Sequence, residues 1–164
     1  DTEYNMYEAT AQILREYGFE QYEISNYAKK GRECRHNVGY WIRQDYLGFG
    51  LGASSLYGKE RFVNTPDMKK YLENSRDPEK IREKEPPLTR EDEMAEFMFL
   101  GLRMTGGISK AEFKRQFGIR IDTIYGDVLR KYKSMGLLQE ENGRIFLSRE
   151  GIHVSNSVMA DFLL

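Results

Sequence analysis

The sequence contains a single cysteine in 164 residues, so no internal disulfide bond can form. A lone cysteine is typical of a protein kept in a reducing compartment, and we therefore expect a cytoplasmic location. No apolar stretch approaches the roughly 20 residues that a membrane-spanning helix needs. The N-terminus lacks both the basic start and the apolar core of a signal peptide. It also lacks an initiator methionine, and we expect the chain to be part of a longer protein.

An excess of charge of one sign is missing as well, because 25 Lys and Arg residues are balanced by 26 Asp and Glu residues. A chain of net charge −1 has no overall positive field that would attract nucleic acid. Aromatic residues, by contrast, make up 13% of the sequence, with 11 Tyr and 9 Phe. Rings with a polar tip suit ligand-binding walls and interfaces as well as cores.

The first part of the chain shows a helical pattern followed by a strand pattern. Residues 5–17 place apolar side chains on one helical face, Gly18 is placed to end the helix, and residues 19–25 alternate bulky and polar side chains. The apolar face consists of Met6, Ala9, Ile13, Leu14 and Tyr17. One helix and one strand cannot cover both faces of a sheet, so we expect the end of a larger α/β domain over residues 1–74. Within it, Thr65 is placed as the N-cap of a further helix, with Pro66 at the first helical position.

A change of composition separates this part from the rest of the chain. Residues 75–87 are charged and interrupted by proline, which predicts a solvated linker. From residue 88 to 164, three helical patterns are followed by Asn142-Gly143, which favours a tight hairpin, and by a closing helix. Ser109 and Ser148 are placed as N-caps. The order matches a winged-helix domain, so we predict an α+β fold that ends in a winged-helix-like domain.

The stretch CRHNVGYW, residues 34–41, places the only cysteine, one of two histidines and the only tryptophan within eight positions. A structural zinc site needs four ligands, and no second Cys/His pair exists in the chain. The remaining histidine, His153, lies far away in the closing helix, and we predict a packing or surface role for it. The stretch therefore indicates either a packing cluster or a ligand site.

These two interpretations assign different roles to the same side chains. In a packing cluster, Tyr40 and Trp41 belong to the core, His36 is a hydrogen-bonded loop residue and Cys34 is a small buried apolar residue. In a haem site, the imidazole of His36 or the thiolate of Cys34 is an axial ligand of the iron. Tyr40 and Trp41 then stack on the macrocycle, and Asn37 holds the imidazole tautomer.

The stretch GFGLGASS contains glycines at positions 48, 50 and 52. Their G-x-G-x-G spacing differs from the G-x-G-x-x-G of dinucleotide-binding loops, and no long helix follows. This argues against a site for nucleotide phosphates. Glycines also let a backbone pass close to a ligand or to another strand, and both explanations remain open.

Four segments, YEISNYAKKG, CRHNVGYW, DYLGFGLGASS and RFVNTPDMKKY, occur in the order and spacing of a known family. The chain resembles the second half of oxygen-independent coproporphyrinogen III oxidase-like proteins, which are radical S-adenosylmethionine (SAM) proteins. One branch acts as haem chaperones and carries the HNxxYW pattern seen here as His36-Asn37-x-x-Tyr40-Trp41. The resemblance implies the end of a partial α/β barrel in residues 1–74, and a haem contact with His36 as metal ligand.

The resemblance also implies a cofactor contact in the glycine loop. Gly50, Ala53 and Ser54 would offer main-chain contacts to SAM at the end of the barrel. Many relatives carry a histidine where this chain has Ser54, so the departure removes a second histidine that could ligate a metal and argues against a two-histidine haem site.

The chemistry of this family depends on a four-iron four-sulfur cluster held by three cysteines of a CxxxCxxC motif. Because the chain has only Cys34, it cannot build this cluster and should have no radical SAM activity alone. We expect a missing N-terminal radical SAM domain to supply it. The implied partners are that domain, a tetrapyrrole such as haem or coproporphyrinogen, and haem-receiving proteins.

Two other functions compete with this one. A nucleic-acid-binding winged helix would need basic residues at the start of its recognition helix and in its wing. Here that helix carries Asp122 near its start and the hairpin tip is Glu140-Glu141, so we do not expect nucleic-acid binding. Alternatively, residues 88–164 form a purely structural interaction domain.

Overall fold

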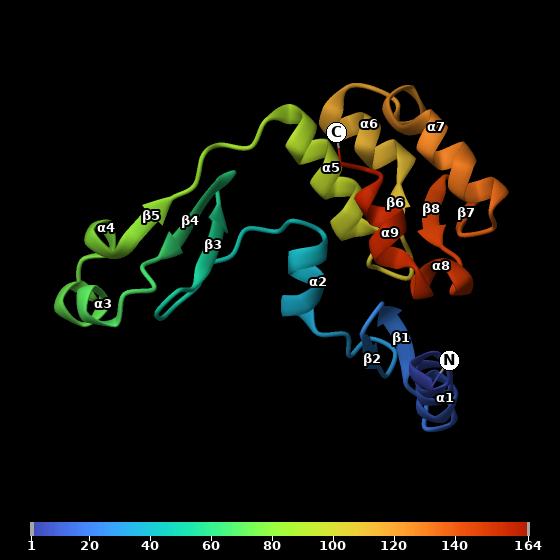
Figure 1. The fold of residues 1–164 in the computed structure, drawn as a ribbon, viewed down its shortest axis with the longest axis horizontal. Helices are drawn as coiled ribbons and strands as arrows, with labels where there is room; N and C mark the ends of the chain where they lie inside the picture. The colour runs from blue at the N-terminus through green and yellow to red at the C-terminus, as the bar shows by residue number, and fades with distance from the viewer. Residues whose placement is uncertain (1, 164) are drawn as a thin grey trace. The chain divides into compact units, whose positions relative to one another are not determined.

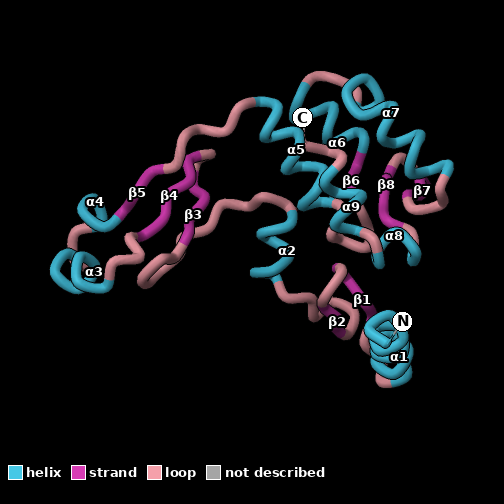
Figure 2. Tube along the Cα trace, in the orientation of Figure 1, coloured by secondary structure: helices cyan, strands magenta, loops and turns pink. Residues whose placement is uncertain are grey.

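The computed structural model describes residues 2–163 and divides into two compact units. The first unit combines residues 1–42 with residues 90–164, and the second consists of residues 43–89. Figure 1 labels the helices and strands of both units, and Figure 2 separates helices, strands and loops by colour. Each unit is described by itself below.

The first unit carries a two-stranded sheet and a three-stranded sheet together with most of the helices of the chain. Its N-terminal elements are α1 (Thr2–Glu16), β1 (Glu20–Glu23), β2 (Asn26–Ala28) and α2 (Arg35–Trp41). Its C-terminal elements are α5 (Arg90–Gly101), β6 (Ile108–Ser109), α6 (Lys110–Phe117), α7 (Ile121–Ser134), β7 (Leu138–Glu141), β8 (Arg144–Leu147), α8 (Arg149–His153) and α9 (Ser155–Ala160). The C-terminal sheet is antiparallel, in the order β6-β8-β7.

Local signals explain where the C-terminal elements begin and end. The Ser109 hydroxyl accepts the N–H of Glu112 at the start of α6, and that helix ends at Gly118 with a φ of 68°. The Ser148 hydroxyl caps α8 in the same way. Asn142 and Gly143 both have positive φ, 51° and 72°, between β7 and β8, as a type I′ turn requires. These caps and the hairpin confirm the sequence predictions. The closing helix, predicted as one, is divided into α8 and α9 at Val154.

The main hydrophobic cluster of the first unit is formed by residues between 94 and 162, and Ile24 packs against it. Its largest fully buried side chains include Phe113, Tyr125 and Phe162. The rings of Tyr125 and Phe162 meet edge to face at 5.3 Å. Burying a side chain of this size contributes about 1.5–3 kcal/mol, so the C-terminal part has the means to fold around its own centre. The core residues are Met94, Met98, Leu102, Ile108, Phe113, Phe117, Ile121, Tyr125, Leu129, Tyr132, Leu138, Ile145, Leu147, Val158, Met159 and Phe162.

Helix α1 forms as predicted, but its apolar face is open within the part of the chain that the structure describes. Met6, Ile13 and Tyr17 are 66%, 53% and 72% exposed. The polar edge of α1 contacts α8 instead, where Glu8 pairs with Arg149 and His153. The predicted strand after Gly18 is β1, and it pairs with β2, which the sequence did not indicate.

The second unit is a three-stranded antiparallel sheet with two short helices. Its elements are β3 (Ser54–Tyr57), β4 (Glu60–Asn64), α3 (Met68–Asn74), α4 (Pro78–Ile81) and β5 (Arg82–Lys84), in the sheet order β3-β4-β5. Residues 75–87, which the sequence indicated as a linker, contain α4 and β5, and β5 pairs with β4. The predicted domain boundaries at residues 74 and 88 stay predictions.

The start of α3 differs from the sequence prediction. Asp67, not Thr65, is the N-cap, and its carboxylate accepts the N–H of Lys70 at 3.0 Å. Thr65 is buried, and its own N–H donates to the carbonyl of Ile81 at 2.6 Å. The Thr65 hydroxyl accepts the N–H of Asp67, two residues on, at 3.3 Å, so Thr65 closes the turn that leads into α3 and the Asp67 carboxylate caps the helix.

None of the helices in residues 2–163 combines the length and the apolar character required to cross a membrane.

Candidate functional site

The segment that holds the HNxxYW pattern is a short helix, α2, whereas the packing interpretation of the sequence treated His36 as a loop residue. Cys34 occupies the N-cap position without a side-chain cap, and the helix ends at Ile42, just before Arg43 with its φ of 57°. A helix of seven residues is too short to be stable by itself. The conformation of α2 therefore depends on what the helix packs against. It contacts α5, and its buried residue is Gly39.

His36 and Tyr40 lie one turn apart on α2 and their rings are in contact. The ring centroids are 4.6 Å apart with an interplanar angle of 71°, an edge-to-face arrangement. His36 is exposed and Tyr40 is half-buried. Among residues 2–163, the ring nitrogens of His36 have no hydrogen-bond partner. The imidazole is therefore available to a ligand from outside the chain.

The other predicted site residues of this segment have different surroundings. Cys34 is exposed and free, two residues before His36. Asn37 is half-buried. Trp41 faces Arg103, whose guanidinium carbon lies 4.3 Å from the centroid of the indole ring. The structure thus brings Cys34, His36 and Tyr40 to accessible positions on α2, whereas one face of the Trp41 ring is covered by another part of the same unit.

The chain offers few ligands for a metal ion. Within residues 2–163, no group of three or more His, Cys, Asp or Glu side chains comes together in a way that could hold one. Haem iron already has four ligands from its macrocycle, so one imidazole or thiolate is enough to bind it axially. A four-iron four-sulfur cluster needs several thiolates, and the chain has one. The residues present fit a haem contact and do not fit an iron–sulfur cluster.

The predicted cofactor loop lies in the second unit, and its main chain is tied to the sheet. The N–H of Gly48 donates to the hydroxyl of Ser55, and the N–H of Gly52 donates to the carbonyl of Thr65. The side-chain amide of Asn64 donates to the carbonyl of Gly50 at 2.8 Å. The N–H groups of Gly48 and Gly52 are therefore engaged within the second unit.

One glycine of this loop is required by a close approach of two backbones. A Cβ atom on Gly48 would lie 2.2 Å from the carbonyl oxygen of Ser54. Of the three predicted cofactor contacts, Gly50 has a φ of 105° and is half-buried, Ala53 is half-buried and Ser54 is exposed. The structure therefore leaves Ser54 accessible at the start of β3.

Sequence reasoning missed an apolar surface on the same loop. Leu47, Phe49 and Leu51 are 47%, 88% and 39% exposed. They alternate with Gly48 and Gly50, and this alternation is the signal that would have identified them.

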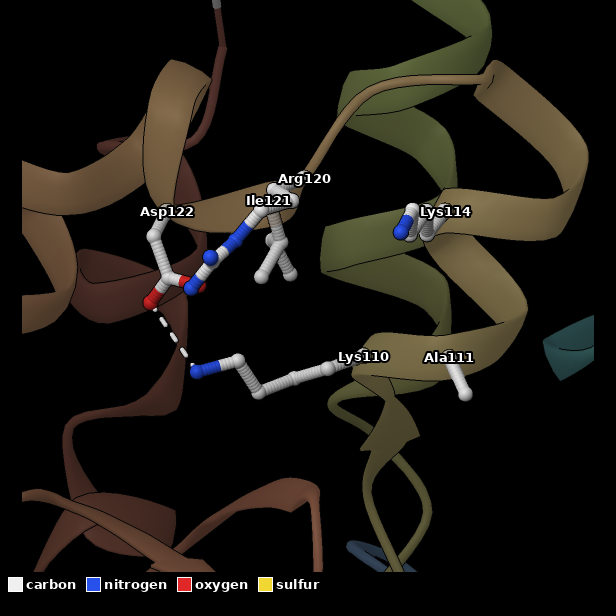
Figure 3. Close-up of a pocket in the computed structure, with 6 residues that line it drawn as sticks. All are labelled: Lys110, Ala111, Lys114, Arg120, Ile121 and Asp122. Atoms are coloured by element: carbon white, nitrogen blue, oxygen red, sulfur yellow. Dashed lines mark hydrogen bonds and ion pairs between the residues drawn. The ribbon is translucent and has the colours of Figure 1, made fainter.

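A pocket of about 270 Å³ in the C-terminal part of the first unit bears on the nucleic-acid hypothesis. Figure 3 shows its lining, with Lys110 reaching from α6 towards Asp122 at the start of α7. Lys110 pairs with Asp122 at 3.0 Å and with Glu140 at 2.8 Å. The hydrogen bond to Glu140 raises the pKa of Lys110, and the hydrogen bond from Lys110 lowers the pKa of Asp122. Lys133 also pairs with Glu140. Two of the basic groups near the predicted recognition helix are thus neutralised within the chain.

Two residues that matter for α2 have no signal in the sequence. Glu23, on β1, is fully buried, and it pairs with Arg103, which lies just after α5. The two residues are separated by 80 positions. No periodicity or motif connects them, so only the tertiary structure could reveal the pair.

Comparison with known proteins identifies the relatives of this chain. Residues 88–154 match the family model of the HemN C-terminal domain. The chain is 36% identical to the haem chaperone HemW of Bacillus subtilis over 99% of its own length and 43% of that protein. It is 32% identical to the haem chaperone HemW of Lactococcus lactis, over 100% of its own length and 43% of that protein. The chain therefore spans less than half of the length of these relatives.

The fold resembles a solved structure of the same group. The coproporphyrinogen III oxidase HemN of Escherichia coli, a radical SAM enzyme, matches 95% of this chain with a TM-score of 0.74 and 16% identity, over 39% of its own length. At 16% identity, this structural match establishes a similar fold only. Together with the sequence matches, it shows that the chain carries a HemN C-terminal domain and is homologous over its whole length to the HemW haem chaperones.

Proposed function

We propose that the chain binds haem through the exposed face of α2 and contributes this contact to a haem chaperone. The observation that carries the proposal is the imidazole of His36, which is exposed, next to an aromatic ring, and without a hydrogen-bond partner among residues 2–163. A histidine that served only packing would be buried with its nitrogens bonded. The relatives with the highest identity given above are named as haem chaperones.

The side chains of α2 have distinct roles in this proposal. The imidazole of His36 would hold the haem iron, and Cys34, exposed at the helix start, is the second group that could ligate it. Tyr40 contacts the imidazole edge to face and would offer its ring to the macrocycle. Asn37 is within the same turn and would hold the imidazole tautomer once the metal is bound. Trp41 belongs to the predicted haem-binding set, but Arg103 occupies one face of its ring.

The remaining cofactors belong to the longer relatives. A radical SAM domain with its own cysteines would supply the iron–sulfur cluster, and Gly50, Ala53 and Ser54 would contact SAM there. The open apolar face of α1 supports this arrangement, because Met6, Ile13 and Tyr17 would be covered by such a domain. We assign the complete protein to the cytoplasm, on the basis of its free, exposed Cys34.

Haem titration followed by the Soret absorption tests the proposal. We expect His36→Ala to weaken the affinity of the chain for ferric haem by about tenfold or more, which corresponds to about 1.4 kcal/mol. The matched control is His153→Gln, which changes the only other histidine, a residue bonded to Glu8 and enclosed by Tyr4 and Tyr7. It should bind haem as the unmodified chain does.

The Cys34→Ala variant separates the two possible ligands. If His36 is the ligand, this variant keeps the Soret position of the unmodified chain. Equal haem affinity of the unmodified chain and of the His36→Ala and Cys34→Ala variants would contradict the proposal.

A further inference from the structure

The carboxylate of Glu23 is fully buried at the junction between β1 and the C-terminal part of the first unit. It accepts the N–H of Ser25 at 2.9 Å and the side-chain amide of Asn26. Its other oxygen lies 3.4 Å from a terminal nitrogen of Arg103. A buried carboxylate is tolerated only where donors and a counter-charge surround it. Arg103 supplies the counter-charge.

The guanidinium of Arg103 lies between two different partners. Glu23 pairs with its edge, and the indole ring of Trp41 lies 4.3 Å from its central carbon. A guanidinium stacks on an aromatic face and hydrogen-bonds in its own plane, so it can serve both partners simultaneously. The side chain is only 23% exposed, and screening by solvent is correspondingly weak.

Main-chain hydrogen bonds fix the position from which Arg103 acts. The N–H of Ile24 donates to the carbonyl of Arg103 at 3.0 Å, and the N–H of Thr105 donates to the carbonyl of Tyr22 at 3.1 Å. Glu23 and Met104 form an isolated β-bridge between these bonds. The turn after α5 is thus joined to the end of β1 on both sides of Arg103.

Trp41 is the residue through which this junction contacts α2. At 3.6 residues per turn, Trp41 lies about 140° around the helix from His36. The junction therefore holds one side of α2 while the imidazole projects from the other. Because α2 has only seven residues and no side-chain cap, an anchor of this kind decides how the helix is oriented.

We propose that Arg103 is a positioning residue for haem binding: held by Glu23 and stacked on Trp41, it sets the orientation in which α2 presents His36. The consequence for haem rests on the proposed function, whereas the anchoring of Trp41 can be measured without haem. Arg103 comes from the C-terminal part of the unit, so that part contributes to a site whose ligands all lie in residues 34–41.

The test combines two measurements on one set of variants. Trp41 is the only tryptophan, so its fluorescence and its quenching by acrylamide report on this position alone. In Arg103→Met we expect a shifted emission and a quenching constant raised by about twofold or more, together with a loss of haem affinity of about tenfold. Arg103→Lys keeps the charge beside Glu23 without the flat stack, and we expect intermediate values for both.

Val158→Ala is the matched control for general destabilisation. Val158 is fully buried in the C-terminal core and is remote in sequence from the junction, and its truncation leaves a cavity. Both variants should have a lower urea midpoint than the unmodified chain. When Val158→Ala is destabilised as much as Arg103→Met, it should still show the Trp41 emission and the haem affinity of the unmodified chain. An equal loss of haem affinity in the control would overturn the positioning role.

The two proposals fail in different ways. If His36→Ala loses haem affinity but Arg103→Met binds haem as the unmodified chain does, the positioning role is wrong and the haem site stands. If His36→Ala binds haem normally, the haem site is wrong, and the positioning role falls with it. Unchanged Trp41 emission and quenching in Arg103→Met would overturn the anchor itself, whatever the haem result.

Discussion

Replacing Gly151 by alanine tests how closely α8 is packed in the C-terminal part. Alanine in a helix interior is normally more stable than glycine by about 0.5–1 kcal/mol, because glycine loses more conformational freedom on folding. At Gly151, however, a Cβ atom would lie 2.0 Å from the carbonyl oxygen of Leu137 and 2.9 Å from its carbonyl carbon. Both obstacles are backbone atoms, and the same oxygen accepts the N–H of Ser148.

The structure sets the sign and the size of the effect. Overpacking of this kind costs about 1–3 kcal/mol, and a clash with backbone belongs at the upper end. After the propensity gain of up to about 1 kcal/mol, we expect a net loss of about 2 kcal/mol in the free energy of unfolding. With an m-value of about 2 kcal/mol per molar urea, the midpoint should fall by about 1 M.

Gly126→Ala is the matched control, because a Cβ atom there would meet only the flexible side chain of Arg130, at 3.4 Å. This variant should be unchanged or more stable by up to about 1 kcal/mol. Urea unfolding followed by circular dichroism compares the two variants. If Gly151→Ala were as stable as Gly126→Ala, the close approach of α8 to Leu137 would be refuted.

Further predictions concern the core, two titrations and the missing cluster. Phe113→Ala should cost about 3–5 kcal/mol in urea unfolding, because Phe113 is fully buried and its ring contacts those of Phe97, Phe117 and Tyr125; a cost below about 1 kcal/mol would contradict that placement. Burial raises the pKa of Tyr125 to about 12 in the folded chain. As the pH rises, the Tyr125 hydroxyl of the unfolded chain ionises before that of the folded chain, so the free energy of unfolding should decline between pH 10 and 12. Tyr125→Phe, which also removes an unpaired buried hydroxyl, should show a shallower decline. The hydrogen bonds from Lys110 lower the pKa of both Asp122 and Glu140, so Lys110→Met should raise both pKa values in an NMR titration. The same variant should lose less stability than the unmodified chain as the pH falls through the folded-state pKa values of these two carboxyl groups. Attempted iron–sulfur reconstitution of the chain should leave no bound cluster, because Cys34 is the only cysteine; a stoichiometric cluster would refute this.

Local sequence signals predicted the C-terminal part of the fold well. The helix of residues 121–134, the caps at Ser109 and Ser148 and the turn at Asn142-Gly143 all depend on residues within a few positions of one another. The same signals failed at the start of α3. Thr65 has the character of a helix cap, but its hydroxyl accepts the N–H of Asp67, and the Asp67 carboxylate caps the helix instead.

The candidate site shows the same division. The HNxxYW pattern could be read from the sequence, and so could the choice of His36 as a possible ligand. That the segment is a helix could not, because α2 is too short to have a clear periodicity and lacks a side-chain cap. Nor could the sequence show that His36 is exposed whereas one face of Trp41 is covered by Arg103.

The sequence by itself determined which chemistry is possible: one cysteine excludes a cluster, and one histidine beside aromatic residues allows a haem contact. It also determined the capped helices and the hairpin, since backbone preferences act over a few neighbouring residues. Only the tertiary structure decided that Glu23 and Arg103, 80 positions apart, meet beneath Trp41. Such a contact results from the packing of whole elements, whose free energy is distributed over the core and leaves no local pattern in the chain.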